Sequence, residues 1–253
     1  MSTAPATPSV SVTHSLVSIL IPCAGQMEYT KLCVPSILKN TRDPFELIAL
    51  DIGSLDGTSG YLAGIAAAAR QRVEVVRTLT DLGLAQVIED AVKLARGEYL
   101  VLLNNDTIVP SLWLTQLVAL AQRIPEVGLI GPMSNYAAPP QVVERVPYRI
   151  RRRAADGLVD VSAVEEFAAR LREENKGKWF EAERLGGFCL LVKREVLKRI
   201  GHLRESGDLG LFDTDSLCAK ARQAGFELAV CKDLFVHHFG TRIFAHGAPA
   251  VSN

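Results

Sequence analysis

The chain alternates short, continuous runs of apolar residues with longer segments in which apolar residues recur at helical spacing. Four of the short runs have the length and apolar content of buried strands: residues 17–21, 45–50, 73–78 and 99–103. Helical segments lie between them, the first ending at Asn40 and the next two covering residues 58–70 and 84–95. This alternation predicts βαβ units on a doubly wound, mainly parallel sheet with flanking helices.

The second half of the chain continues this alternation less regularly. Helices are predicted from Pro110 to Arg123 and over residues 161–174 and 213–224. Strands are predicted at residues 127–130, 188–192 and 227–231. Residues 136–153 are rich in proline and arginine, and they predict an irregular, mobile loop. The fold class predicted for the whole chain is therefore α/β, without internal repeats.

Polar residues follow the predicted strands of the first half. Asp51, Asp81 and Asp106 come after the second, third and fourth strands. Open α/β sheets bind their ligands beyond the carboxyl ends of their strands, where loops present side chains to one crevice. The sequence therefore predicts a polar ligand site at this edge of the sheet.

Composition narrows the class of protein. The 253 residues carry 28 Lys and Arg against 28 Asp and Glu, so the net charge gives no reason to expect a nucleic-acid partner. Hydrophobic residues make up 48%, which excludes a disordered chain, and the apolar runs are too short for a transmembrane segment. Residues 1–15 lack the features of a signal peptide and predict a disordered leader. Five scattered cysteines without CxxC pairs predict buried, reduced thiols and a cytoplasmic location.

A glycine-rich turn follows the second strand, over residues 51–58. It would let backbone amides and a carboxylate approach a polar ligand closely, and Thr58 can cap the helix that follows. The turn matches neither GxGxxG nor GxxxxGK[ST], which argues against a Rossmann dehydrogenase and a P-loop NTPase. An ordinary βα turn remains the alternative.

Two further segments carry candidate metal ligands. Asn104, Asn105 and Asp106 follow the fourth strand, and oxygen ligands of this kind suit a hard divalent cation. The alternative is that Asp106 caps the next helix. His237 and His238 follow the last strand, where a neutral imidazole could complete the metal site. A surface histidine pair without function is the alternative.

An acidic pair, Asp213 and Asp215, stands at the start of a predicted helix. One of these carboxylates can act as a general base, whereas a favourable interaction with the helix N-terminus would require no chemistry. Trp179 and Phe180 can stack on a sugar or pack in the core. The arginines at 149 and 151–153 can bind an anion or form solvated surface.

Taken in this order, these segments resemble the family 2 glycosyltransferases, which have the GT-A fold. The resemblance covers residues 17–244. The turn at 51–58 is similar to the family's Asp-Asn-Gly-Ser-Thr-Asp-Gly-Thr turn, and residues 104–106 resemble a variant of its DxD metal motif. Residues 187–194 resemble its acceptor-side strand, and residues 212–215 stand where its acidic base motif lies.

The resemblance implies an inverting transferase that moves a sugar from a nucleotide diphosphate sugar to a hydroxyl of a glycan, lipid-linked or protein acceptor. Residues 16–110 would bind the donor, residues 111–245 would bind the acceptor and carry the base, and residues 246–253 would be a tail. The implied donor-binding residues are Pro22, Asp51, Asp56, Gly57, Asp81, Asn104 and Asn105. Asp106, with His237 or His238, would hold Mn²⁺ or Mg²⁺, and Asp213, with Asp215 as second choice, would be the base.

Two other functions remain open at this point. Ile52 and Thr214 depart from the family pattern, which would fit a catalytically impaired module that only binds a nucleotide sugar or a carbohydrate. A nucleotidyltransferase would need a basic phosphate loop after the first strand, and residues 22–26 contain no basic residue. The sugar, the nucleotide base, the acceptor, a homodimeric state and peripheral association with the inner face of a membrane are left open by the sequence.

Overall fold

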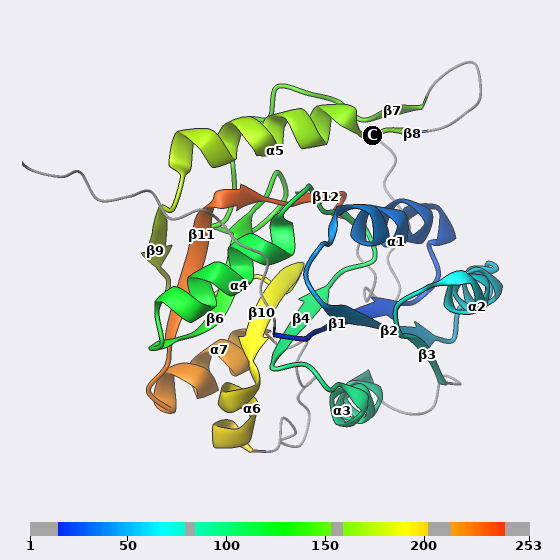
Figure 1. Cartoon of the computed structure of the whole chain (residues 1–253), viewed down its shortest axis with the longest axis horizontal. Coiled ribbons are helices and arrows are strands. Elements are labelled where there is room, and N and C mark those ends of the chain that lie inside the picture. Colours follow the sequence, from blue (N-terminus) through cyan, green and yellow to red (C-terminus); the bar gives the residue numbers. More distant parts are fainter. Residues whose placement is uncertain (1–14, 79–83, 153–158, 202–213, 241–253) are drawn as a thin grey trace, which may run out of the picture.

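The computed structural model describes residues 15–78, 84–152, 159–201 and 214–240. Its centre is an eight-stranded sheet in the order β3-β2-β1-β4-β10-β6-β11-β9 (Figure 1). The first half of the chain supplies four parallel strands: β1 Val17–Cys23, β2 Phe45–Ile52, β3 Val73–Thr78 and β4 Tyr99–Leu103. The second half supplies β6 Val127–Met133, β9 Trp179–Glu181, β10 Cys189–Lys193 and β11 Glu227–Phe235.

Strand β10 joins the two halves of the sheet. It lies antiparallel to β4 on one side and to β6 on the other, while β6 and β11 are parallel. Edge strand β9 is antiparallel to β11. The sheet is therefore mainly parallel, as predicted, and the antiparallel β10 brings the chain of the second half alongside the end of β4.

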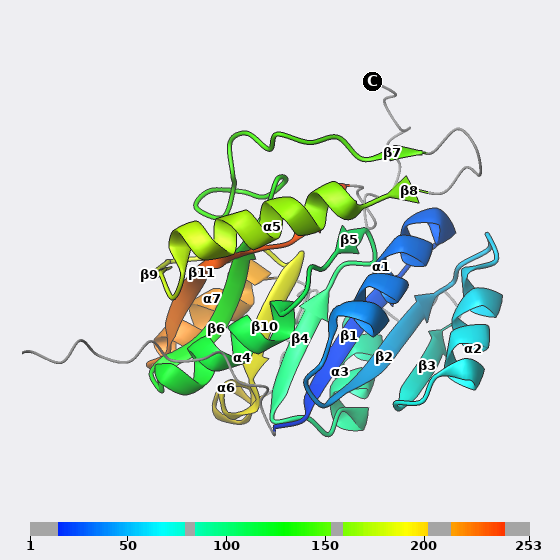
Figure 2. The ribbon, with the colours of Figure 1, turned by 45° about the horizontal axis from the view of Figure 1, so that its top comes forward.

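Helices cover both faces of the sheet (Figure 2). On one face lie α1 Met27–Asn40, α2 Thr58–Ala68 and α4 Trp113–Arg123, which share one buried cluster with the sheet. On the other face lie α3 Leu84–Leu94, α6 Arg194–Ile200 and α7 Thr214–Gln223, over a second cluster. Ile19 and Leu20 of β1 enter opposite clusters, because side chains alternate along a strand. The continuous apolar runs of the sequence therefore reflect burial on both faces.

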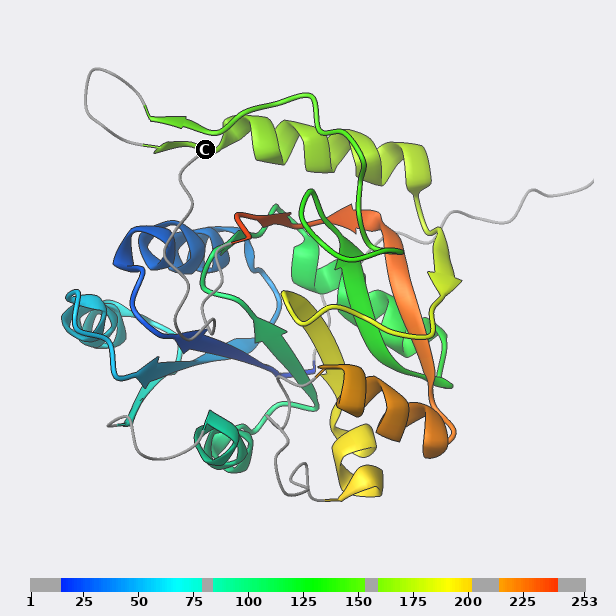
Figure 3. The ribbon, with the colours of Figure 1, turned by 180° about the vertical axis from the view of Figure 1, so that it is seen from behind.

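The remaining elements are short or lie outside these layers. Helix α5, Ser162–Asn175, packs beside β11 over a third cluster that includes Phe235. Strand β5, Thr107–Ile108, pairs with β12, His237–His238, and β7, Arg151–Arg152, pairs with β8, Val159–Asp160. Seen from behind, α6 and α7 lie next to each other and below α5 (Figure 3).

The buried carboxylate of Glu46 links neighbouring strands at the end of the sheet opposite to the predicted site. Glu46 is 2% exposed, and its Oε1 accepts hydrogen bonds of 2.6 Å from both the Ser18 hydroxyl and the Arg96 amide. Its Oε2 pairs with the Arg72 guanidinium. Burial alone would raise the pKa of Glu46, but the hydrogen bonds from Ser18, Arg96 and Arg72 lower it. Glu46 is therefore ionised and links β1, β2 and the start of β4.

The α/β fold and the predicted strands are confirmed, and so is the burial of all five cysteines, which are free thiols. The prediction that Thr58 caps α2 is wrong. Gly57 is the N-cap residue, and Thr58 is the first helical residue. Asp56 takes the capping role instead, because its Oδ1 accepts bonds from the Thr58 amide and hydroxyl.

Several elements were not predicted from the sequence. Helix α6 and strand β9 are the longest of these, and β5 and β12 are two residues each. Of the irregular loop predicted at residues 136–153, residues 136–150 form no regular helix or strand, whereas Arg151 and Arg152 form β7. Hydrogen bonds tie the first part of this segment to β6 and to Gly186. Among the described residues, no helix has both the length and the apolar character needed to cross a membrane.

Candidate functional site

The pairing of β12 with β5 places a histidine against the polar turn after β4. His237 is opposite Ile108 and His238 is opposite Thr107, so His238 lies next to Asp106. Asp106 does not cap a helix, because β5 follows it and α4 begins only at Trp113. This rules out the alternative role considered for Asp106 and places the carboxylate beside an imidazole.

The His238 ring and the Asp106 carboxylate have the geometry of an incomplete cation site. Asp106 is fully buried, and its Oδ1 lies 3.3 Å from His238 Nε2. His238 Nδ1 lies 2.8 Å from the Tyr136 carbonyl oxygen. A carbonyl can only accept, so Nδ1 carries a proton, and in the corresponding neutral tautomer the Nε2 lone pair faces the carboxylate. Two acceptors that face each other at this distance favour a shared cation, and a ligating histidine usually donates its other N–H in this way.

Three neighbours fix the position of His238. The Asn135 side chain donates to the His238 carbonyl and accepts from the His238 amide, both at 2.9 Å. The Phe188 ring stacks on the imidazole with 5.3 Å between centroids and 15° between planes. The Tyr136 ring meets it edge-on at 5.4 Å. The ring is therefore held in one orientation before any ligand binds.

His237 has a different environment. Consecutive strand residues point to opposite sides, and His237 Nδ1 lies 2.8 Å from the Tyr148 hydroxyl while its ring packs against Phe239. Burial, together with the neighbouring His238, lowers the pKa of His237 to about 4, although Asp106 acts in the opposite direction. His237 is therefore neutral and part of an aromatic cluster. The geometry favours His238 over His237 as the ligand next to Asp106.

Asn104 and Asn105 have separate roles in the turn after β4. The Asn104 amide Nδ2 is 3.4 Å from His238 Nε2, and the side chain is partly exposed. Asn105 is fully buried, and its amide donates to the Gly25 carbonyl at 3.3 Å and to the Thr30 hydroxyl at 2.9 Å. Asn105 therefore ties this turn to the loop after β1, while Asn104 faces the open site.

The glycine-rich turn after β2 is linked to the same loop. The Ser54 hydroxyl accepts from the Gly25 amide at 2.8 Å, and Asp56 Oδ2 accepts from the Met27 amide at 2.8 Å. Partial burial would raise the pKa of Asp56, but hydrogen bonds from Thr58 and Met27 lower it. Asp56 and Gly57, whose φ is 90°, therefore shape the turn, and Asp56 stays ionised.

Asp51 lies at the end of β2 and is fully buried. Its Oδ1 accepts from the Ser54 amide at 3.1 Å, and its Oδ2 lies 3.5 Å from Arg77 Nε on β3. Pro22 is buried next to Leu50 at the end of β1. Asp81, the remaining predicted donor-binding carboxylate, lies outside the described residues.

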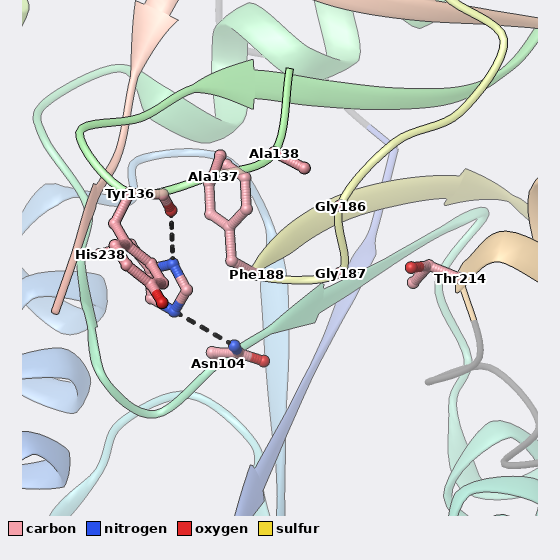
Figure 4. Close-up of a pocket in the computed structure, with 9 residues that line it drawn as sticks. All are labelled: Asn104, Tyr136, Ala137, Ala138, Gly186, Gly187, Phe188, Thr214 and His238. Atoms are coloured by element: carbon pink, nitrogen blue, oxygen red, sulfur yellow. Dashed lines mark hydrogen bonds between the residues drawn. The ribbon is translucent and has the colours of Figure 1, made fainter. Parts of the chain in front are cut away.

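A cavity of about 540 Å³ opens beside Asn104 and His238 (Figure 4). Its walls come from the ends of β4, β10, β12 and α7 and from the loop after β6. The lining residues are Asn104, Tyr136, Ala137, Ala138, Gly186, Gly187, Phe188, Thr214 and His238. The volume lies within the range of small-molecule pockets and suits a ligand of the size of a sugar.

Comparison with known sequences identifies the family. The model of Glycosyl transferase family 2 matches residues 18–201. The chain belongs to this family. A protein of Sinorhizobium fredii, y4gI, is 31% identical over 213 residues, which are 83% of this chain and 23% of that protein. The glycosyltransferase GlyG of Streptococcus pneumoniae is 31% identical over 121 residues, 48% of this chain and 40% of GlyG. The chain thus spans well under half the length of these curated relatives.

The structural comparison agrees with the family. The mannosyltransferase PcManGT of Pyrobaculum calidifontis, solved in complex with GDP-Man and Mn²⁺, superposes with a TM-score of 0.64 at 18% identity. The match covers 93% of this chain and 60% of that one. The family 2 chain described here therefore has the GT-A fold, as the sequence resemblance implied.

Of the two predicted base residues, the structure describes only Asp215, which lies on α7 of this family 2 chain. Thr214 begins the helix and lines the cavity, while Asp215 lies in the first turn and is exposed. Asp213, the first choice for the base, precedes Thr214 in the sequence and lies outside the described residues. The structure therefore gives the positions of Thr214 and Asp215, and the identity of the base stays a prediction.

Trp179, Phe180 and Arg149 are not among the described residues that line the cavity. Trp179 and Phe180 belong to β9 and pack against opposite clusters of the core, which supports the packing role. Arg149 is exposed, residues 151–152 form β7, and Arg153 lies outside the described residues. Among the described lining residues, Tyr136 and Phe188 carry benzene rings. Tyr136 had no signal beyond its position in an irregular segment.

In the part of the chain that the structure describes, no group of three or more His, Cys, Asp or Glu side chains converges as a complete metal site. Among the described residues Asp106 and His238 would therefore supply two ligands, and a bound cation would need further oxygen atoms from elsewhere. A diphosphate provides such atoms.

Proposed function

We propose that this chain is the catalytic domain of a nucleotide-sugar-dependent glycosyltransferase that uses a divalent cation, Mn²⁺ or Mg²⁺. The observation that carries this proposal is the pairing of Asp106 with His238, whose tautomer is fixed by the Tyr136 carbonyl, at the edge of the sugar-sized cavity. The GT-A fold shared with a GDP-mannose- and Mn²⁺-bound mannosyltransferase supports it.

The donor would bind across the ends of β1, β2 and β4. Asp51 and Pro22, with Asp81, would line the pocket for base and ribose, and Asp56 and Gly57 would hold the shape of the turn. Asn104 would face the ribose, since its side chain is partly exposed beside His238. Asn105 would act by holding the two loops together. In this arrangement residues 16–110 form the donor half.

Asp106 Oδ1 and His238 Nε2 would hold the cation, which when bound neutralises negative charge on the departing nucleotide diphosphate. The chain itself orients the two ligands. Asn135 fixes the backbone of His238, and the Tyr136 carbonyl keeps the proton on Nδ1 so that Nε2 remains available. Phe188 excludes water from one face of the ring.

For the transfer step we propose inversion at the anomeric carbon. A carboxylate of residues 213–215, Asp213 in first place and Asp215 in second, would accept the proton of the acceptor hydroxyl. The hydroxyl oxygen would form a bond to the anomeric carbon while the bond from that carbon to the diphosphate oxygen breaks, and the electron pair would leave with the nucleotide diphosphate. Thr214 on the cavity wall supports this location, and residues 111–245 would form the acceptor half.

A thermal-shift screen tests the donor and the metal together. The purified chain is heated with UDP-, GDP-, dTDP- and CMP-sugars, each with Mn²⁺, Mg²⁺ or a chelator. We expect a metal-dependent rise in melting temperature with sugars of one nucleotide base, because a ligand that binds only the folded state stabilises it.

The variant Asp106→Asn should abolish this rise. Asp90→Asn is the matched control, because Asp90 lies on the surface of α3 and pairs with Lys93 away from the cavity. If no nucleotide sugar raises the melting temperature with any metal, the transferase proposal fails. A donor that binds without turnover in the presence of glycan, lipid-linked and protein acceptors would instead favour a carbohydrate- or nucleotide-sugar-binding module.

A further inference from the structure

The loop after β6 is fixed to the wall of the cavity. In this loop, residues 134–143, the Ser134 amide donates to the Gln141 carbonyl at 2.8 Å, and the Val143 amide donates to the Ser134 carbonyl at 2.8 Å. The Gln141 side chain is buried; it donates to the Pro132 carbonyl at 2.9 Å and accepts from the Gly186 amide at 2.6 Å. The loop and the Gly186 segment therefore form one rigid wall.

This wall presents an aromatic ring to solvent. Tyr136 is 53% exposed, although large aromatic side chains usually bury most of their surface. Its main chain is held by the bond from His238 Nδ1, and its ring packs edge-on against His238. The ring also packs closely on Gly240, where a Cβ atom would come within 2.6 Å of ring carbons. The ring is therefore held in place at the cavity and left open on part of its surface.

The remaining lining of the cavity indicates the class of ligand. Ala137, Ala138 and Phe188 are apolar, and the polar side chains among the described lining residues are Asn104, Thr214 and His238. None of the described lining residues is Lys, Arg, Asp or Glu. On the described part of these walls a ligand with a charged phosphate would find no cationic side chain, whereas a neutral polyhydroxyl ring would find both apolar surface and hydrogen-bonding groups.

We propose that Tyr136 is the platform on which the acceptor stacks, and that the acceptor group bound here is a neutral hexopyranoside. The apolar C–H face of a pyranose packs on an aromatic ring, while its hydroxyl groups bond to the polar side chains at the rim. Tyr136 lies in the half of the chain proposed to bind the acceptor, and beside His238, so that a stacked acceptor would sit next to the donor's diphosphate. The inference rests on the proposed function.

Saturation-transfer NMR tests this inference. Methyl pyranosides of mannose, glucose, galactose and N-acetylglucosamine are the neutral probes, and glycerol 3-phosphate and ribitol 5-phosphate are the anionic ones. Each is added to the intact chain with Mg²⁺ and either UDP or GDP, because Mn²⁺ would broaden the signals. We expect saturation of the ring C–H protons of at least one methyl pyranoside and none for the two phosphates.

The variants separate stacking from other contributions. Tyr136→Ala should raise the dissociation constant of the bound pyranoside about tenfold, while Tyr136→Phe and Tyr136→Trp should stay within about threefold of wild type. Leu94→Ala is the control, since Leu94 is 41% exposed on α3 and should leave binding unchanged. Circular dichroism of each variant checks the fold.

The inference is overturned if no methyl pyranoside binds the wild type, if a polyol phosphate binds in its place, or if Tyr136→Ala binds the pyranoside as well as wild type does. The thermal shift with nucleotide sugars separates the two proposals. A wild type that binds a nucleotide sugar but no pyranoside overturns the Tyr136 platform and leaves the transferase proposal standing. A wild type that binds no nucleotide sugar overturns the transferase proposal itself.

Discussion

The packing of Gln141 against Gly131 allows a quantitative test of the cavity wall. The Gln141 amide donates to the Pro132 carbonyl and accepts from the Gly186 amide, and it is 1% exposed. A buried polar group that loses its partner costs about 1–3 kcal/mol. Gln141→Ala leaves the Pro132 carbonyl and the Gly186 amide without this partner, so we expect it to lower the free energy of unfolding by about 2–4 kcal/mol.

Gly131→Ala disturbs the same contact between Gln141 and Gly131 by adding a methyl group at Gly131. An added Cβ would lie 2.3 Å from Gln141 Nε2 and 3.2 Å from its Cδ, so the amide group must move and its bond to Pro132 is lost. We expect a cost of about 1–3 kcal/mol for this variant alone. In the Gln141→Ala variant the Gln141 amide is absent, so the methyl group added by Gly131→Ala has room. In that background Gly131→Ala should lower the free energy of unfolding by less than about 0.5 kcal/mol.

Urea denaturation of the wild type, both single variants and the double variant measures this coupling. The double variant should be more stable than the sum of the single effects predicts, by about 1–2 kcal/mol. Effects that add within about 0.5 kcal/mol would refute the contact between Gln141 and Gly131. Gln141→Glu provides a further check, because Glu can still accept from the Gly186 amide but, when ionised, cannot donate to Pro132.

Three further predictions concern the buried Glu46, the turn after β2 and the cavity. Because the folded pKa of Glu46 lies below its ordinary value of 4.5, its contribution to stability is present above that pH and is lost as the pH falls through the lowered pKa. The difference in unfolding free energy between wild type and Glu46→Gln, about 1–3 kcal/mol near neutral pH, should therefore shrink in acid; a constant difference would contradict this. Gly57→Ala should cost about 1 kcal/mol because φ is 90°, and urea denaturation measures it; an unchanged midpoint would contradict the strained turn. Gly187→Ala would place its Cβ 2.8 Å from Thr214 Cγ2, so it should raise the KM for the acceptor about tenfold while the KM for the donor stays normal. An equal rise in both KM values would contradict the assignment of the cavity to the acceptor.

The sequence predicted the central architecture because burial on both faces produces continuous apolar runs, as in β1 and β4. It did not predict β9 or β12, whose pairing depends on contacts with distant strands. It also assigned the cap of α2 to Thr58, because the αL conformation of Gly57 and the reach of Asp56 are properties of the folded turn.

The candidate site was predicted in part. The sequence named Asp106 and both histidines, but only the alternation of side chains along β12 separates His238 from His237. Tyr136 and Gln141 carry no periodic signal, because they lie in an irregular segment whose shape comes from hydrogen bonds to β6 and to Gly186. Such positions become visible only when residues far apart in the sequence are brought together.

Binding of Mn²⁺, followed by the electron paramagnetic resonance signal of the free ion, tests the central claim most directly. Titrations are made with and without UDP or GDP, on wild type, His238→Ala and the control His237→Phe. We predict that wild type and His237→Phe remove the free-ion signal when the nucleotide diphosphate is present, and that His238→Ala weakens this binding at least about tenfold. Equal nucleotide-dependent binding by wild type and His238→Ala would contradict the account.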